Sequence, residues 1–146
     1  MSTPDSTTPW PRPGATLLFR SMLSLIFLVA GTGHLFNTDH IVQRLLDAEM
    51  GFLATAVAPA RPLVLLAGVA LLIGGAGLLL GYRTRWGAGL LILVILPITV
   101  TIQIGRATLG PLFKNVAIMG GLLFFLTHGA GPYSLDQVFG GDGLSD

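Results

Sequence analysis

The sequence predicts an all-α integral membrane protein: an antiparallel four-helix bundle with an amphipathic surface helix between the first and second spans. Four apolar runs, at residues 17–36, 63–82, 86–104 and 112–128, each approach the length that a helix needs to cross a bilayer. That length is about 20 residues for about 30 Å of hydrocarbon. Hydrophobic residues form 52% of the 146-residue chain and charged residues only 10%, whereas soluble domains carry about 25% charged residues.

The composition also narrows the classes of function. The net charge of +1 gives no support for the clustered basic face on which nucleic-acid binding depends. Cysteine is absent, so this chain itself supplies neither thiol–disulfide chemistry nor iron–sulfur ligands. The signatures of serine hydrolases, HExxH metalloproteases and phosphate loops are missing as well. We therefore expect no nucleic-acid partner, no metal, haem or iron–sulfur cofactor, and no stand-alone enzyme.

Polar segments flank the bundle, which we place at residues 15–128. Residues 1–14 are rich in Pro, Ser and Thr and are predicted to be disordered. Arg12 is the only basic residue before the first apolar run, and that run has full spanning length. Both features favour a retained span over a cleaved signal peptide. Residues 129–146 are Gly-rich and polar, and we interpret them as a C-terminal tail.

The first connection, residues 37–62, is too long for a simple turn. Apolar residues such as Ile41, Leu45 and Phe52 recur in it at near-helical spacing, with charged residues between them. This pattern predicts an amphipathic helix lying on the membrane surface, interrupted at Gly51. Two roles remain open for it: a plain cover for the end of the bundle, or a lid over a ligand entrance.

Four spans place both termini on one side of the membrane, here called the terminal side, and the 37–62 connection on the other, the loop side. Basic residues divide evenly between the two sides. The tie is broken by Arg83 and Arg85, which sit in the shortest turn and directly beside two spans. We therefore predict that both termini are cytoplasmic.

Small residues and one proline indicate how the spans pack. The second span carries many Gly and Ala residues, among them Gly77 and Gly81 at GxxxG spacing, which favours close approach of a neighbouring helix. Pro97 lies inside the third span and should kink it, because proline cannot donate the helical hydrogen bond to the preceding turn.

Two polar clusters are the candidate sites, since ionisable groups inside spans are costly in hydrocarbon and usually point inward. Antiparallel spans bring one set together on the loop side: His34, Gln103, Lys114 and Asn115. A second set gathers on the terminal side: Arg20, Arg83, Arg85 and His128. The alternative is that Arg20 and Lys114 extend to lipid head groups and that the histidines are ordinary interfacial side chains. About 20 Å should separate the histidines of the two sets, so they cannot share a metal ion.

Three segments, in this order and spacing, resemble the DoxX family. They are Gly-Thr-Gly-His-Leu-Phe at 31–36, Gly-Leu-Leu-Leu-Gly-Tyr-Arg-Thr-Arg-Trp-Gly-Ala at 77–88, and Phe-Lys-Asn-Val-Ala-Ile-Met-Gly-Gly-Leu-Leu at 113–123. The resemblance implies a small four-span protein of the bacterial cytoplasmic (inner) membrane. Some relatives in this family form part of a thiosulfate:quinone oxidoreductase, and others are membrane partners of redox-detoxification proteins. The resemblance therefore implies a role of this kind. The positions that match are His34, Arg83, Arg85, Lys114 and Asn115, and the resemblance makes none of them catalytic.

Three hypotheses for the function therefore stay open. The first is an accessory or anchoring subunit of a membrane redox complex, with a quinone-type site formed by His34, Gln103, Lys114 and Asn115. There a neutral histidine could both donate to and accept from a ligand. The second is a scaffold that contacts the bilayer and another membrane protein and holds no cofactor. The third is a binder of another small lipophilic molecule.

Overall fold

The computed structural model describes residues 12–103 and 109–140. Most of the N-terminal segment predicted to be disordered, residues 1–11, lies outside these ranges. So do residues 104–108 and 141–146, including the last residue of the predicted third span.

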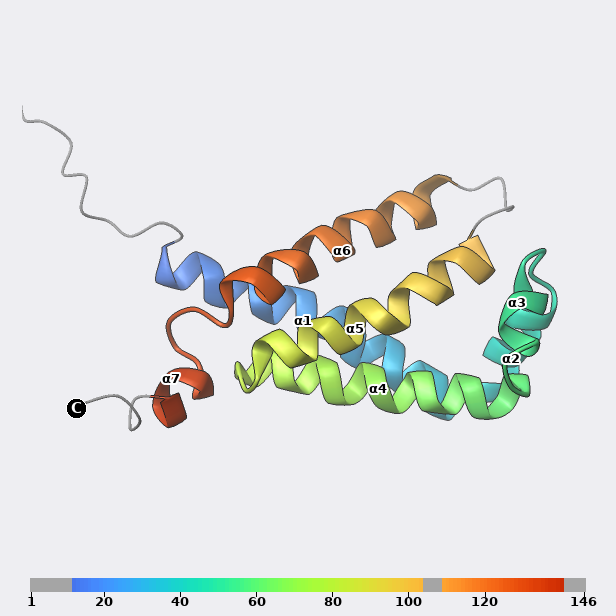
Figure 1. Cartoon of the computed structure of the whole chain (residues 1–146), viewed down its shortest axis with the longest axis horizontal. Helices are drawn as coiled ribbons and strands as arrows, with labels where there is room; N and C mark the ends of the chain where they lie inside the picture. Colours follow the sequence, from blue (N-terminus) through green and yellow to red (C-terminus); the bar gives the residue numbers. More distant parts are fainter. Residues whose placement is uncertain (1–11, 104–108, 141–146) are drawn as a thin grey trace, which may run out of the picture.

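The described chain is helical, and its helices are arranged as the sequence predicts. Four of them are long and apolar enough to cross a membrane, and consecutive spans run antiparallel (Figure 1). Two short helices, α2 and α3, lie across the loop side. The fold class, a multi-pass membrane bundle with an amphipathic helix between the first two spans, is thereby confirmed. The elements are α1 (Pro13–Phe36), α2 (Thr38–Leu46), α3 (Gly51–Thr55), α4 (Ala60–Leu80), α5 (Thr84–Ile98), the π-helical turn η1 (Thr99–Gln103), α6 (Leu109–His128) and α7 (Leu135–Gly140).

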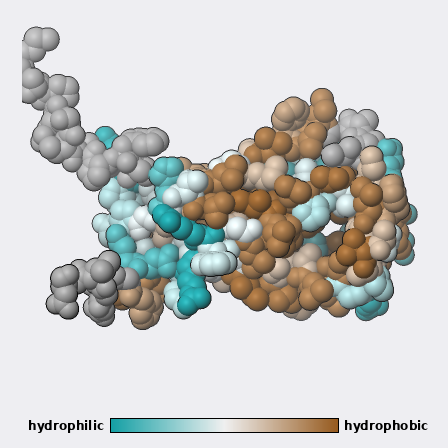
Figure 2. Space-filling view, viewed as in Figure 1, coloured by the Kyte–Doolittle hydropathy of each residue, from teal (hydrophilic) through white to brown (hydrophobic). Residues whose placement is uncertain are grey.

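Apolar side chains form both the interior and the outer surface of the bundle. The core contains Phe27, Leu78, Leu91, Leu122 and Phe125, all nearly or fully buried. Large apolar side chains also cover the outside of the spans, as expected where lipid replaces water as the solvent. Figure 2 shows this apolar surface as a broad band, with hydrophilic residues towards the two ends of the molecule.

Glycine residues, which have no side chain, allow the helices to approach closely at two crossings. At the first, between α1 and α4, Gly31 faces Gly68: a Cβ atom added at Gly31 would lie 3.0 Å from the carbonyl oxygen of Gly68. At the second, between α4 and α5, Gly74 and Gly87 face each other in the same way. Close backbone approach of this kind is what holds helices together in lipid.

The predicted Gly77–Gly81 pair has a different role from helix–helix packing. Gly81 ends α4 with a positive φ of 67°, and the N–H groups of Gly81 and Tyr82 donate to the carbonyls of Leu78 and Gly77. This is a Schellman C-cap, which favours glycine because glycine tolerates the left-handed conformation. The two glycines shape the turn that leads into α5.

Towards the loop side the pair α5 and α6 separates from the pair α1 and α4 (Figure 1), while α1 and α4 stay in close contact there at Gly31 and Gly68. The rings of Phe19 and Phe125, 5.2 Å apart, join α1 to α6 near the terminal side. Towards the loop side α6 moves away from α1 and α4, and α5 moves away from α4. The space that opens between these pairs of helices is where the predicted loop-side residues lie.

Candidate functional site

A cavity of about 210 Å³ lies between α1 and α6 on the loop side; nine of its fourteen described lining residues are apolar, and we call it the polar cavity because the other five are polar or charged. All four residues that the sequence predicts for this side line it: His34, Gln103, Lys114 and Asn115. Arg44 of α2 lines it as well. Antiparallel topology explains the meeting, because α1 and η1 end where α6 begins.

His34 is held in place by its own helix and by a glycine of α4. Its Nδ1 lies 2.8 Å from the carbonyl oxygen of Ala30, one turn earlier in α1. A carbonyl can only accept a hydrogen bond, so Nδ1 carries the proton and Nε2 of the neutral ring is an acceptor. The Cβ of His34 packs where a side chain at Gly68 would otherwise stand, 2.8 Å from the position of the missing Cβ. With Nδ1 committed to Ala30, Nε2 is the nitrogen of His34 that remains for a ligand, and a neutral His34 that both donates and accepts stays a prediction.

Asn115 connects α6 to the π-helical turn. Only 5% of its surface is exposed, and its Nδ2 donates to Oγ1 of Thr99 at 2.8 Å. The Thr99 hydroxyl in turn donates to the carbonyl of Ile95 at 2.7 Å. Thr99 is the first residue of η1, two residues after Pro97. The predicted disturbance of the third span at Pro97 therefore takes the form of a wide helical turn, and this turn supplies the partner that orients Asn115.

The remaining polar residues of the cavity differ in exposure. Oε1 of Gln103 is buried and has no hydrogen-bond partner within residues 12–103 and 109–140. Lys114 and Arg44 are exposed and place positive charge at the rim of the cavity. The interior of the cavity thus offers amide groups, which can donate and accept, and its rim offers cationic donors.

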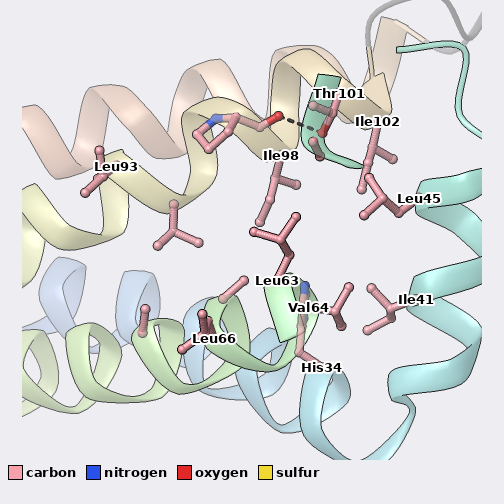
Figure 3. Close-up of a pocket in the computed structure, with 15 residues that line it drawn as sticks. His34, Ile41, Leu45, Leu63, Val64, Leu66, Leu93, Ile98, Thr101 and Ile102 are labelled. Carbon is pink, nitrogen blue, oxygen red and sulfur yellow. Dashed lines mark hydrogen bonds between the residues drawn. The ribbon is translucent and has the colours of Figure 1, made fainter. Parts of the chain in front are cut away.

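An apolar cavity of about 300 Å³ adjoins the polar one (Figure 3). Four residues line both cavities: His34, Ile41, Ile98 and Ile102. The rest of its wall comes from α2, α3, α4 and α5, with Leu45, Ala54, Leu63, Val64, Leu93 and Pro97 among the residues. Within the described part of the chain, Thr101 is the one hydroxyl-bearing residue on this wall, and its Oγ1 donates to the Pro97 carbonyl at 2.7 Å.

The amphipathic segment closes the loop side of these cavities. Ile41 and Leu45 of α2 face the apolar cavity, and Leu45 is buried. α2 is tied to the end of α1 because the Thr38 hydroxyl donates to the carbonyl of His34 at 2.7 Å. The predicted cover is thus bonded to His34, a residue that lines both cavities, and it lines both of them itself.

On the terminal side, Arg20 does not extend to head groups. The side chain is 1% exposed, and its two terminal nitrogens each donate over 2.8 Å, to the carbonyls of Ala130 and Tyr133. The segment interpreted as a polar tail therefore folds back onto the bundle over residues 129–140 and includes α7. Asp136 completes this contact: its carboxylate accepts from the backbone N–H groups of Arg83, at 2.6 Å, and Thr84, at 3.0 Å, and caps the start of α5.

The other terminal-side residues do not join Arg20 in one cluster. The Arg83 side chain lies beside the ring of Tyr82, its Cζ 6.0 Å from the ring centroid. Arg85 donates to the carbonyl of Thr127 at 3.2 Å, and the ring of His128 stacks on Phe124 at 4.6 Å. The partners of these four residues are mainly backbone carbonyls and aromatic rings. Arg20 and Arg85 thereby join segments that are distant in the sequence, whereas Arg83 and His128 contact rings within their own segments.

Sequence reasoning found the polar lining of the loop-side cavities and missed the apolar lining. Residues such as Ile98 and Val64 look like any other apolar residue of a span, so no signal separates a cavity wall from a core or a lipid-facing surface. The signal for Thr99 was available, because a helical threonine commonly donates its hydroxyl to the carbonyl four residues earlier, here that of Ile95. Among the described residues, no three His, Asp or Glu side chains could hold a metal ion.

One comparison with known proteins finds a match. The family model described as DoxX matches residues 15–104, which run from α1 through the π-helical turn and include His34 and Gln103. No curated protein and no solved structure matches the chain.

Proposed function

The chain belongs to the DoxX family, and on that premise we propose that it is an accessory subunit of a membrane redox complex and holds a quinone-type amphiphile within its bundle. The observation that carries the proposal is the junction of a polar and an apolar cavity at His34. An amphiphile with a polar ring and a long apolar tail needs two such compartments side by side. A protein that only anchors a partner needs neither.

The dimensions and chemistry of the cavities support this ligand class. Small-molecule sites are mostly apolar hollows of about 300–1,000 Å³ with a few polar groups that fix orientation. The polar cavity, about 210 Å³, is large enough for one substituted ring only. The apolar cavity, about 300 Å³, would take the first part of a tail.

A groove on the outer surface offers a route for the rest of the tail. It has a volume of about 410 Å³ and shares Ala54, Leu63, Pro97 and Thr101 with the apolar cavity. Leu53 and Val57, both exposed, line its outer part. A tail lying in this groove would pass from the apolar cavity, between α4 and α5, into lipid, so the ligand would enter and leave through the bilayer.

A scaffold without cofactor is the second candidate, and one surface favours it. An apolar groove of about 640 Å³ lies on the outer face of α5 and α6 around Trp86, which is 79% exposed. In either case we place the protein in the bacterial cytoplasmic membrane with both termini cytoplasmic. Its expected partner is a membrane or membrane-associated redox protein.

Ligand content after gentle purification distinguishes the two candidates. The protein is extracted from its native membrane with its lipids, and quinone per protein is measured together with the melting temperature. We expect wild-type protein to retain quinone and His34→Leu to lose it without unfolding, because leucine still packs against Gly68. His128→Leu, the same change at the exposed histidine of the terminal side, is the matched control and should retain quinone.

Two outcomes would contradict the quinone proposal. Wild-type protein that carries no quinone but retains a partner polypeptide would favour the scaffold. Full quinone retention in His34→Leu would place the ligand elsewhere. A different lipophilic molecule in the extract would preserve the site and change its ligand.

A further inference from the structure

At the junction of the two loop-side cavities, His34 presents a hydrogen-bond acceptor. The Nδ1–H of His34 is committed to the Ala30 carbonyl, so the neutral ring has only the lone pair of Nε2 left for a ligand. This nitrogen has no partner among the described residues, and its ring lines both cavities. The position where head and tail of a ligand would meet therefore presents an acceptor.

The amide groups around His34 can pair with a ligand donor or a ligand acceptor, so His34 is the group that discriminates between them. Thr99 and Thr101 donate their hydroxyl protons to carbonyls of their own helix, those of Ile95 and Pro97. Asn115 uses one amide N–H on Thr99, which leaves its second N–H to donate and its Oδ1 to accept. Gln103 adds an acceptor, Oε1, that lacks a donor in the described part of the chain, together with the two N–H donors of the same amide. A turn of this amide towards the cavity that it lines would let a ligand hydroxyl satisfy it.

The strongest donors lie at the rim. Lys114 and Arg44 are exposed, so water and lipid head groups can satisfy them whether or not a ligand is bound. An acceptor such as Nε2 of His34 has no such compensation once a ligand has displaced water from the cavity. A desolvated acceptor left without a donor weakens ligand binding, whereas an exposed donor contributes almost the same free energy with or without the ligand.

We infer that the site selects the reduced, hydroxyl-bearing form of its ligand, a quinol, over the oxidised quinone. This inference rests on the proposed function. A quinol O–H can donate to Nε2 of His34, whereas a quinone carbonyl would face that nitrogen as a second acceptor. The expected preference is about tenfold or more, since one desolvated acceptor left unpaired weakens binding by about that factor.

Binding of three matched probes to the purified full-length protein tests the inference. They are a short-tailed benzoquinol kept anaerobic, the corresponding quinone, and the di-O-methyl ether of the quinol, which keeps ring and tail but cannot donate. We expect the quinol to bind at least about tenfold more tightly than the other two. In His34→Leu the preference should fall severalfold, and in His128→Leu it should remain.

The outcomes separate this inference from the function on which it rests. Equal binding of quinol and di-O-methyl ether by the wild-type protein would overturn the selection for a donor and leave the quinone-type site standing. Tighter binding of the quinone would also overturn it, and would mean that Nε2 carries a proton. Failure of all three probes to bind would remove the proposed site itself. The comparison of probes needs no variant, so it holds even if His34→Leu does not fold.

Discussion

The glycine that makes room for His34 provides a sharp test of the packing. A Cβ atom added at Gly68 would lie 2.8 Å from the Cβ of His34 and 3.3 Å from the carbonyl oxygen of Gly31. Neither atom can move aside by a side-chain rotation, because a Cβ and a carbonyl follow the backbone. Gly68→Ala must therefore push α1 and α4 apart at their crossing, and it must move His34 relative to both cavities.

The expected magnitude is a balance of two effects. Alanine is favoured over glycine inside a helix by about 1 kcal/mol, whereas forcing extra volume into a packed contact costs about 1–3 kcal/mol. Gly33 and Gly120 lie in α1 and α6, and a Cβ added at either meets nothing within 4 Å. Gly33→Ala and Gly120→Ala should thus be neutral or slightly stabilising. Gly68→Ala should be less stable than these controls by about 1–3 kcal/mol.

Thermal unfolding of the wild-type protein and the three variants in the same detergent measures this difference. Gly68→Ala should melt at the lowest temperature of the four and should also lose bound ligand. A melting temperature for Gly68→Ala equal to those of the controls would refute the close crossing at Gly31 and Gly68. The account of how His34 is positioned would fall with it.

Three further changes test the terminal side and the topology. Arg20→Met should lower the free energy of unfolding by about 3 kcal/mol or more, because two hydrogen bonds from a charged group are lost and two carbonyls lose their donor; a stable variant would show that the contact is unimportant. Asp136→Ala should lower the free energy of unfolding by about 1–3 kcal/mol, because the cap of α5 is lost. Gln137→Ala, a change at the exposed neighbouring residue, should alter it by less than about 0.5 kcal/mol. In intact cells a membrane-impermeant thiol reagent should label Ala56→Cys and not Gln137→Cys, since the chain has no native cysteine; the reverse pattern would invert the topology.

The spans were predictable because bilayer thickness sets their length and antiparallel topology decides which ends meet. This is why four residues that are distant in the sequence, such as His34 and Lys114, could be placed together without a structure. The break in the amphipathic segment and the disturbance at Pro97 were predictable for a related reason, because glycine and proline change the backbone locally. The break lies at residues 47–50, and Gly51 is the first residue of α3.

Other features depend on partners that a sequence does not specify. Gly81 has a spacing suited to helix packing, and only its φ of 67° shows that it ends a helix. Asp136 belongs to a polar segment after the last span, and nothing local shows that it caps a helix that begins 52 residues earlier. The proton is placed on Nδ1 of His34 because this atom lies 2.8 Å from the carbonyl oxygen of Ala30. That distance depends on the side-chain rotamer, which the sequence does not specify.

Photolabelling with an azido-quinone tests the central claim most directly, because it reports where a quinone-type head group lies. The purified protein is irradiated with the probe, and labelled peptides are identified by mass spectrometry, with the unlabelled quinol as competitor. The account predicts adducts on the walls of the two cavities, near Ile41 of α2 or in the segment from Leu93 to Ile102, and their loss on competition. Adducts confined to the terminal side around Arg20, or labelling that the competitor does not reduce, would contradict it.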